Sequence, residues 1–296
     1  TDIVISHGDP SAVTLSNVGD MGVGSSATVN IKLYDDFGNI CTTSPSMTVD
    51  MDINSDQDRT SIYINGDDST GTQNSASPFT VTVSGGNTNT TLYSTLAQTV
   101  TLSLSNPSIV ATTGSNKNFN FNPGVASQIG FNFTASSVTT DDTVSLEVKA
   151  KDQYGNLATS YSSSSIYLTA APGGNLVSAV SSAPLVFVNG EASYNVQNTR
   201  PETVVFGFDG GTLGGLTTES GRENYSMSVS VGAPDHFSLG TVSSGVTADD
   251  TAVANIDIYS YDQFDNLTPT SDDVTINISG SAFFDVNSTN SYILDF

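Results

Sequence analysis

Three stretches of the chain alternate apolar and polar residues with a period of two. Their inward positions are Ala27, Val29, Ile31 and Leu33; Val144, Leu146, Val148 and Ala150; and Ala254, Ile256, Ile258 and Ser260. Most of the residues between them are polar, which is typical of a strand with one face on a core and the other in water. The pattern therefore predicts that these positions are buried, and that Glu147 and Lys149 lie outside the core.

Each of the three strands ends in a related five-residue turn. The copies are Asp35-Asp36-Phe37-Gly38-Asn39, Asp152-Gln153-Tyr154-Gly155-Asn156 and Asp262-Gln263-Phe264-Asp265-Asn266. We expect the first Asp to accept a backbone hydrogen bond from two residues on, and the aromatic residue to fold over the core edge. The Gly-Asn pair supplies positions that tolerate positive φ. Because Asp265 replaces the glycine, the third turn is expected to be strained.

A second alternating strand follows each turn. It begins after an aliphatic residue, and its inward positions are Met47, Val49, Met51 and Ile53; Ile166, Leu168 and Ala170; and Val274, Ile276 and Ile278. Turns rich in Gly, Ser, Thr, Asn and Asp separate further strand-like runs, and no stretch shows sustained helical periodicity. The sequence predicts an all-β chain built on a repeated unit of strand, turn and strand.

The order of these motifs resembles the immunoglobulin-like repeats of bacterial and archaeal cell-surface proteins, including the invasin and intimin type. The second repeat matches best, through Val148-Lys149-Ala150-Lys151-Asp152-Gln153-Tyr154-Gly155-Asn156, then Ile166-Tyr167-Leu168, then Phe187-Val188-Asn189-Gly190-Glu191-Ala192. The third repeat departs at Asp265. The resemblance implies tandem immunoglobulin-like β-sandwiches in a rod-like array. Such modules serve as spacers, adhesins, surface-layer parts and enzyme appendages, so the fold alone does not choose among these functions.

The spacing of the turns sets the expected domains. Residues 35 and 152 lie 117 positions apart and residues 152 and 262 lie 110 apart, the size of one such sandwich. We expect residues 1–7 to be the last strand of a preceding module or a linker, 8–123 and 124–231 to be whole modules, and 232–296 to be an incomplete third module. Both ends then look like incomplete sandwiches. This predicts either that the chain is a segment of a longer array or that it is a protomer that exchanges strands with a neighbour.

The chain is strongly acidic, with 30 Asp and Glu against seven Lys and Arg and a formal charge of −23. Nucleic acid and anionic membranes are poor partners for such a chain, because both need clustered cations to offset phosphate charge. The charge favours a salty or calcium-containing exterior, or serves only solubility. No run of about 18 apolar residues exists, so no membrane insertion is expected. Cys41 is single and Trp is absent, so the Cys-Trp-Cys pin of antibody-type domains is missing.

Calcium is the candidate cofactor. Asp52, Asn54, Asp56 and Asp58 alternate like the start of a calcium loop, but Gln57 stands where that loop needs glycine and Tyr63 where it needs glutamate. The alternative is an Asp/Asn turn at the end of a strand. The pairs Asp141-Asp142 and Asp249-Asp250 are either solvated turn residues or halves of an interdomain calcium site.

Catalysis and modification have few candidates. Both histidines, His7 and His236, sit beside Gly/Pro joints, and neither G-x-S-x-G nor H-E-x-x-H occurs. All five Glu lie in the second module, where a paired-carboxylate glycosidase is the open alternative to our prediction of no enzyme. N-glycosylation sequons, which matter only if the source glycosylates its surface proteins, occur at Asn89, Asn132, Asn224, Asn266, Asn277 and Asn287.

These observations favour a secreted or cell-surface structural protein, an array of modules in a surface layer, filament, stalk or adhesin shaft. Its expected partners are neighbouring copies or modules of the same surface protein, and surface glycans. The alternatives are an adhesin module that binds carbohydrate or a host protein, through exposed aromatics such as Tyr259 and Tyr261, and a non-catalytic appendage of a secreted enzyme.

Overall fold

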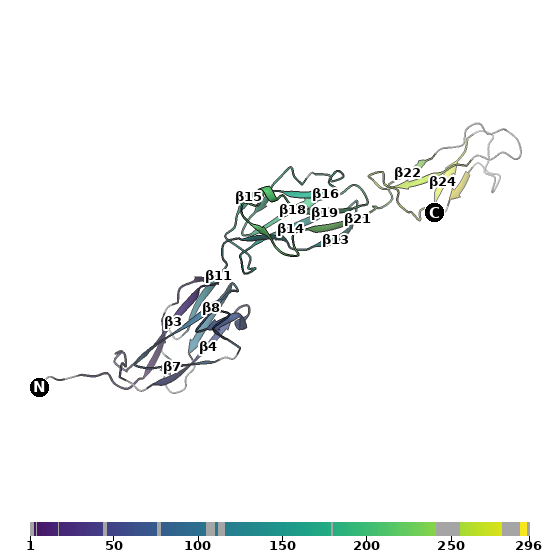
Figure 1. Ribbon diagram of the computed structural model, residues 1–296. Helices are drawn as coiled ribbons and strands as arrows, with labels where there is room; N and C mark the ends of the chain where they lie inside the picture. Colours follow the sequence, from purple (N-terminus) through teal and green to yellow (C-terminus); the bar gives the residue numbers. More distant parts are fainter. Residues whose placement is uncertain are drawn as a thin grey trace. The chain divides into compact units, whose positions relative to one another are not determined.

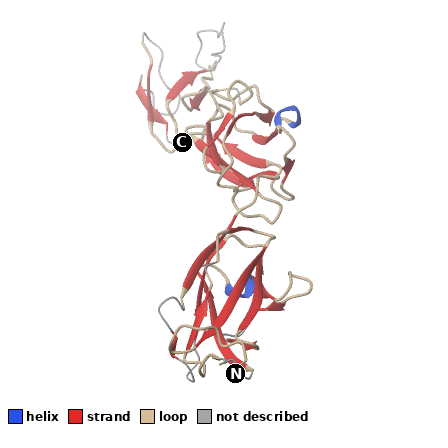
Figure 2. Cartoon of the chain, turned by 90° about the vertical axis from the view of Figure 1, so that its left-hand side faces the viewer, coloured by secondary structure: helices blue, strands red, loops and turns tan. Residues whose placement is uncertain are grey.

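The computed structural model describes residues 3, 5–16, 18–43, 46–75, 78–104, 110–111, 116–178, 180–240, 255–279 and 291–294 (Figure 1). Over these residues the chain is all-β, and its helical segments are two 3-10 turns, η1 (Arg59–Ser61) and η2 (Gly210–Thr212) (Figure 2). The chain divides into two compact units, Thr1–Gln128 with Ala150–Tyr161 and Ile129–Lys149 with Ser162–Phe296. Within the described part, no helix is long and apolar enough to cross a bilayer.

The first unit contains a β-sandwich of two sheets. One sheet has the order β10-β1-β3-β8-β5-β6 and the other the order β2-β11-β9-β4-β7. The strands are β1 (Ala12–Leu15), β2 (Met21–Gly22), β3 (Ser26–Tyr34), β4 (Met47–Ser55), β5 (Ile62–Ile64), β6 (Thr72–Gln73), β7 (Phe79–Val83), β8 (Asn87–Ser94), β9 (Gln98–Leu104), β10 (Val110–Ala111) and β11 (Lys117–Asn122). Most neighbours are antiparallel, but β10 and β2 join their sheets as parallel edge strands.

The core of this sandwich comes from the inward faces of both sheets. It includes Val29, Ile31 and Leu33 from β3 and Met51 and Ile53 from β4, all fully buried. Burial of one such side chain stabilises a fold by about 1.5–3 kcal/mol, so these alternating strands supply much of the driving force for folding. The thiol of Cys41 is buried in the same cluster.

The second sandwich lies largely in the second unit. Its sheets have the orders β18-β14-β12-β20 and β13-β21-β19-β16, and β15 pairs with β17. The strands are β12 (Gln128–Phe131), β13 (Ala135–Thr139), β14 (Val144–Lys151), β15 (Ser163–Ile166), β16 (Leu168–Ala171), β17 (Leu185–Phe187), β18 (Glu191–Val196), β19 (Thr203–Phe208), β20 (Thr217–Thr218) and β21 (Tyr225–Ser230). Its core combines aliphatic residues with aromatic ones, and Phe131 is stacked on Phe208 at 4.7 Å between ring centroids.

The third repeat contributes two antiparallel strand pairs to the second unit. Strand β22 (His236–Leu239) pairs with β23 (Ile258–Tyr261), and β24 (Val274–Asn277) pairs with β25 (Ser291–Leu294). Three features named in the sequence, Ala254, the Asp249-Asp250 pair and the Asn287 sequon, lie outside the described residues. Each described sheet takes all its strands from one of the expected module ranges, 8–123, 124–231 or 232–296. The two compact units divide the chain at other positions, since residues 150–161 belong to the first unit.

The predicted strand register is confirmed. The inward positions of β3 are buried, those of β14 are buried except for a half-buried Val144, and Glu147 is exposed. Lys32, Lys149 and Lys151 all take outward positions. In the third copy Ser260 is buried, while Ile256 and Ile258 are half-buried. A register shifted by one residue would have placed Glu147 in the core.

Candidate functional site

The three copies of the turn share one internal hydrogen-bond pattern. One carboxylate oxygen of the first Asp accepts the N–H of the aromatic residue at 3.0, 2.9 and 2.9 Å in chain order. The same oxygen accepts the N–H of the closing Asn at 2.8, 3.0 and 2.9 Å. The Asn side-chain amide donates to the carboxylate in all three copies. The predicted role of the first Asp is therefore confirmed, and the turn is a preformed local unit.

The fourth position of each turn has a left-handed backbone. Gly38 and Gly155 have φ of 80° and 88°, and Asp265 has φ of 64°. A side chain in this region costs roughly 1–2 kcal/mol, less for Asp and Asn, so the predicted strain falls on Asp265. The imidazole of His236 lies 3.3 Å from the Asp265 carboxylate.

The second carboxylate oxygen of each first Asp binds the joint that leads into the repeat. It accepts the N–H of Gly8, Gly124 and Gly232 at 2.9, 2.8 and 3.2 Å. Two residues beyond each closing Asn, the chain folds back, since the N–H groups of residues 41, 158 and 268 bond the carbonyls of residues 33, 150 and 260. Each turn therefore ties together the joint, the end of one strand and the start of the next segment.

In the first and third turns, these hydrogen bonds lower the pKa of the Asp carboxylate. The N–H groups of Gly8 and Asn39 lower the pKa of Asp35 to about 2. Burial alone would raise the pKa of Asp262, but hydrogen bonds from Thr140, Asn266 and Gly232 outweigh it and hold that pKa below its ordinary value. Both turns are therefore built around an ionised carboxylate.

In two of the copies, the closing Asn also binds a loop of the sandwich that comes before it in the chain. Within the first unit, the Asn156 amide donates to the Thr95 carbonyl at 2.8 Å and its oxygen accepts the Ala97 N–H at 2.9 Å. Within the second unit, the Asn266 amide donates to the Thr199 carbonyl at 2.7 Å. Thr95 follows β8 and Thr199 follows β18, the strands that pair with β3 and β14, so the two loops are topological equivalents.

The aromatic residue of the second turn takes part in the same contact. Tyr154 lies against Gly24, where an added Cβ would be 2.8 Å from its ring carbons, and Gly24 has φ of 76°. Burial, together with a hydrogen bond to Tyr154, raises the pKa of Tyr93 to about 12. Phe37, at the same position in the first turn, is 88% exposed. The prediction that this aromatic covers the edge of its own core is therefore wrong for Phe37, because the turn directs that side chain away from its own sandwich.

The second unit adds a further clamp at its joint. The Thr140 hydroxyl donates to Asp262 at 2.7 Å, and the two carboxylate oxygens of Asp141 accept from Ala233 N–H at 2.8 Å and from the Gln263 amide at 2.9 Å. Asp142, by contrast, closes its own loop by accepting from Thr139. The Asp141-Asp142 pair is visible in the sequence, but this role of Asp141 is not, because its partners lie about a repeat away.

The residues of the predicted calcium loop belong to a strand, a cross-strand hydrogen bond and a helix cap. Asp52 and Asn54 lie on extended β4, Asp56 accepts the Thr99 N–H, and Asp58 caps η1 by accepting from Thr60. Over the described residues, no three His, Cys, Asp or Glu side chains are grouped closely enough to hold a metal ion. Calcium binding stays a prediction, tested by thermal melts in calcium and in chelator; equal melts would contradict it.

The predicted sequons have different surroundings. Asn89 accepts from Asn30, Asn132 donates to Glu147, Asn224 lies beside Gly207, and Asn277 is exposed on β24. The Asn266 amide donates to the Thr199 carbonyl, and Thr268 of its sequon is buried. Glycosylation of the sequons remains a prediction.

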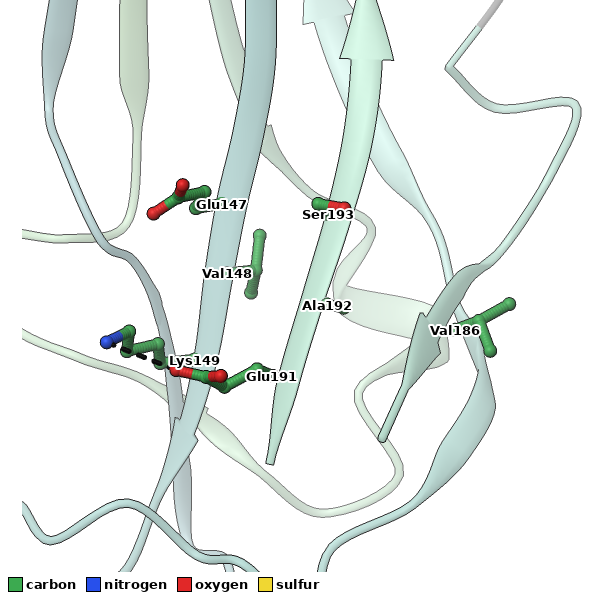
Figure 3. A pocket seen from close by; sticks show the side chains of 7 residues that line it. All are labelled: Glu147, Val148, Lys149, Val186, Glu191, Ala192 and Ser193. Carbon is green, nitrogen blue, oxygen red and sulfur yellow. Dashed lines mark ion pairs between the residues drawn. The ribbon is translucent and has the colours of Figure 1, made fainter. Parts of the chain in front are cut away.

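A hollow of about 410 Å³ lies on the outward face of the second sandwich (Figure 3). It is lined by Glu147, Val148, Lys149, Val186, Glu191, Ala192 and Ser193. Lys149 pairs with Glu191 at 3.3 Å, and Glu147 accepts the Asn132 amide at 2.8 Å. Both carboxylates thus have partners on the protein, as expected for a solvated sheet face.

Comparison with known proteins gives structural relatives only. No family model and no curated protein matches the chain. Among solved structures, it is similar to the Escherichia coli adhesin FdeC, with 14% identity over 98% of this chain and 89% of that one and a TM-score of 0.51. Invasin, a bacterial integrin-binding protein, aligns at 15% identity over 95% of this chain and 53% of that one, with a TM-score of 0.35. Domains 4–9 of the surface layer protein SbsC align at 12% identity over 97% and 43%, with a TM-score of 0.30. The likeness to FdeC confirms the fold expected from the sequence, tandem immunoglobulin-like β-sandwiches.

Proposed function

We propose that the chain is an extracellular structural protein, an array of immunoglobulin-like modules in a surface layer, filament, stalk or adhesin shaft. The observation that supports this most is the repeated turn, whose Asn binds an equivalent loop in each unit. A turn that is closed by its own hydrogen bonds and also binds the preceding sandwich is suited to joining modules in series. In this proposal the chain's partners are neighbouring modules or copies of the same protein.

The physical role of the array is mechanical. Backbone ladders and buried faces resist unfolding within each module, and the junction bonds limit motion at each joint. The formal charge of −23 keeps such an array hydrated and discourages collapse of copies onto one another. FdeC is itself an adhesin, but at this identity it supports the fold alone, and the functional proposal depends on the junctions.

Surface labelling tests the proposal. An antibody raised against the chain is expected to stain intact, unpermeabilised source cells, and external protease is expected to remove the epitope. A marker of the cell interior that survives the protease serves as the control. An epitope that is reached only after permeabilisation would contradict the proposal.

The alternative, a carbohydrate-binding module, is favoured by an aromatic face on β22 and β23. His236 stacks on Tyr261 at 5.5 Å between ring centroids, and Tyr259 next to them is 38% exposed. Aromatic rings of this kind stack on sugars, although they are also ordinary cross-strand neighbours. A glycan array with the intact chain and with Tyr259→Ala separates the two: binding that the substitution abolishes would favour the alternative.

The remaining predictions of function fit the same proposal. The chain is proposed to be non-catalytic, and an appendage of a secreted enzyme is distinguished from a surface array by the other domains that the full gene encodes. Incubation of the intact chain with chromogenic glycosides tests the glycosidase alternative. Turnover lost in Glu147→Gln would overturn the non-catalytic proposal.

A further inference from the structure

The first copy of the turn has the binding groups of the other two but lacks their partners. The Asn39 amide bonds the Asp35 carboxylate at 3.1 and 3.3 Å, as its equivalents do. Among the described residues it makes no hydrogen bond outside its own turn. Phe37, whose counterpart Tyr154 packs on Gly24, is 88% exposed. The first turn therefore presents an Asn amide that, among the described residues, has no partner outside its own turn, beside an exposed aromatic ring.

The segment that leads into the first turn also lacks the partners that the equivalent segments have. The joint glycines Gly8, Gly124 and Gly232 are equivalent, since each binds the first Asp of its turn. The residues three and five positions before Gly124 are Phe121 and Phe119, and before Gly232 they are Val229 and Met227; all four are buried in the preceding sandwich. The same offsets before Gly8 give Ile5 and Ile3, both 89% exposed.

We propose that the Asp35–Asn39 turn is a docking face for the end loop of another immunoglobulin-like module, whose last strand includes Ile3 and Ile5. This inference rests on the proposed function and adds to it an interaction surface, with a partner of stated chemistry. The partner is a module directly ahead of Gly8 in the same polypeptide, because the chain enters this turn in the same way that it enters the second turn from the first sandwich.

The other junctions define what the docking loop must offer. It presents a backbone carbonyl to the Asn amide, as Thr95 and Thr199 do, and an N–H two residues later to the Asn oxygen, as Ala97 does. The docking module also needs a glycine at the point where the aromatic ring of the turn packs, as Gly24 leaves room for Tyr154. Phe37 lacks the hydroxyl of Tyr154, so the matching loop needs an apolar surface at that point and no hydrogen-bond partner.

A tandem chain tests the proposal. A copy of residues 8–123 replaces residues 1–7 of the full chain, so that the copy's own Thr95 loop comes ahead of Gly8. Asn39→Ala is then introduced into the turn that follows the joint, not into the added copy, and its effect on thermal unfolding is compared with that of the same substitution in the parent chain. We expect the substitution to lower the Tm of the tandem by roughly 4–8 °C more than that of the parent, from two extra hydrogen bonds. Hydroxyl-radical labelling of Phe37 is expected to fall several-fold in the tandem.

Two further variants keep the test decisive. A second tandem carries residues 124–231 in the added position, with Thr199 in place of Thr95, in case the first one folds poorly. Phe37→Tyr is expected to stabilise the first tandem and not the parent, because the new hydroxyl meets Tyr93 of the added copy as Tyr154 does in this chain. Equal losses for Asn39→Ala in parent and tandems, with Phe37 labelled equally, would overturn the proposal.

Asn156→Ala separates this proposal from the function on which it rests. If Asn156→Ala lowers the Tm but Asn39→Ala lowers it no more in the tandems than in the parent chain, the result would support the junction at Asn156 and refute only the docking face. An Asn156→Ala variant with the same Tm as the parent chain would refute the proposed function. If the parent chain instead self-associates with rising concentration and Asn39→Ala abolishes this, the occupant is a second copy and the assignment to a preceding module is overturned.

Discussion

Asn156→Ala, compared with Asn39→Ala, isolates the contribution of a junction to stability. The two residues make the same bonds inside their turns, to Asp152 at 3.0 and 3.2 Å and to Asp35 at 3.1 and 3.3 Å. Asn156 also donates to the Thr95 carbonyl and accepts from the Ala97 N–H. Its side chain is only 9% exposed, so water replaces these bonds poorly once they are lost.

The magnitude follows from the two extra hydrogen bonds. Each contributes about 0.5–1.5 kcal/mol net, so Asn156→Ala should cost about 2 kcal/mol more free energy of unfolding than Asn39→Ala. For domains of this size that is a difference of roughly 4–8 °C in Tm. Because a chain of several sandwiches unfolds in steps, calorimetry should show the shift in the transition of the first unit. Equal Tm values for the two variants would refute the reasoning.

Three other substitutions probe the same contacts. Gly24→Ala should cost about 1–3 kcal/mol, because Gly24 has positive φ and lies against Tyr154, whereas Gly22→Ala, with open space around its Cβ, should cost nothing; urea unfolding measures both. Asp265→Gly should stabilise the chain by about 0.5–1 kcal/mol by removing a side chain from φ of 64°, and a lower urea midpoint would contradict this. Because the folded-state pKa of Asp262 is lowered, its ionised carboxylate stabilises the fold above the unfolded-state pKa of about 3.9, and this contribution is lost as pH falls below that value. Asp262→Asn should therefore lower Tm at pH 7, with a gap to the parent chain that narrows between pH 4 and pH 2; a constant gap would show that the charge is not involved.

The turn and the strand register were predictable because both are encoded locally. Alternation in β3 and β14 fixes which residues face the core, and the Asp-to-Asn spacing of four fixes the hydrogen bonds within the turn. The substitution at Asp265 could likewise be interpreted from the sequence, since only the backbone conformation at that position matters.

The junction contacts were not predictable, because their partners are far apart and carry no side-chain signal. Asn156 binds a backbone carbonyl 61 residues before it, and Asn266 binds one 67 residues before it. Any residue at position 95 or 199 would offer the same carbonyl. Phe37 and Tyr154 occupy the same place in the motif, so nothing in the motif itself distinguishes the exposed ring from the packed one.

The exchange rates of three side-chain amides test the central claim, that the closing Asn of the turn binds a preceding sandwich in the second and third copies and, among the described residues, only its own turn in the first. In the intact chain, nuclear magnetic resonance would follow exchange of the Asn39, Asn156 and Asn266 amide protons with water. We expect slow exchange at Asn156 and Asn266, each with an amide proton bonded to a carbonyl of the preceding sandwich, and faster exchange at Asn39, whose amide is bonded only within its own turn. Three amides that exchange at the same rate would contradict this expectation.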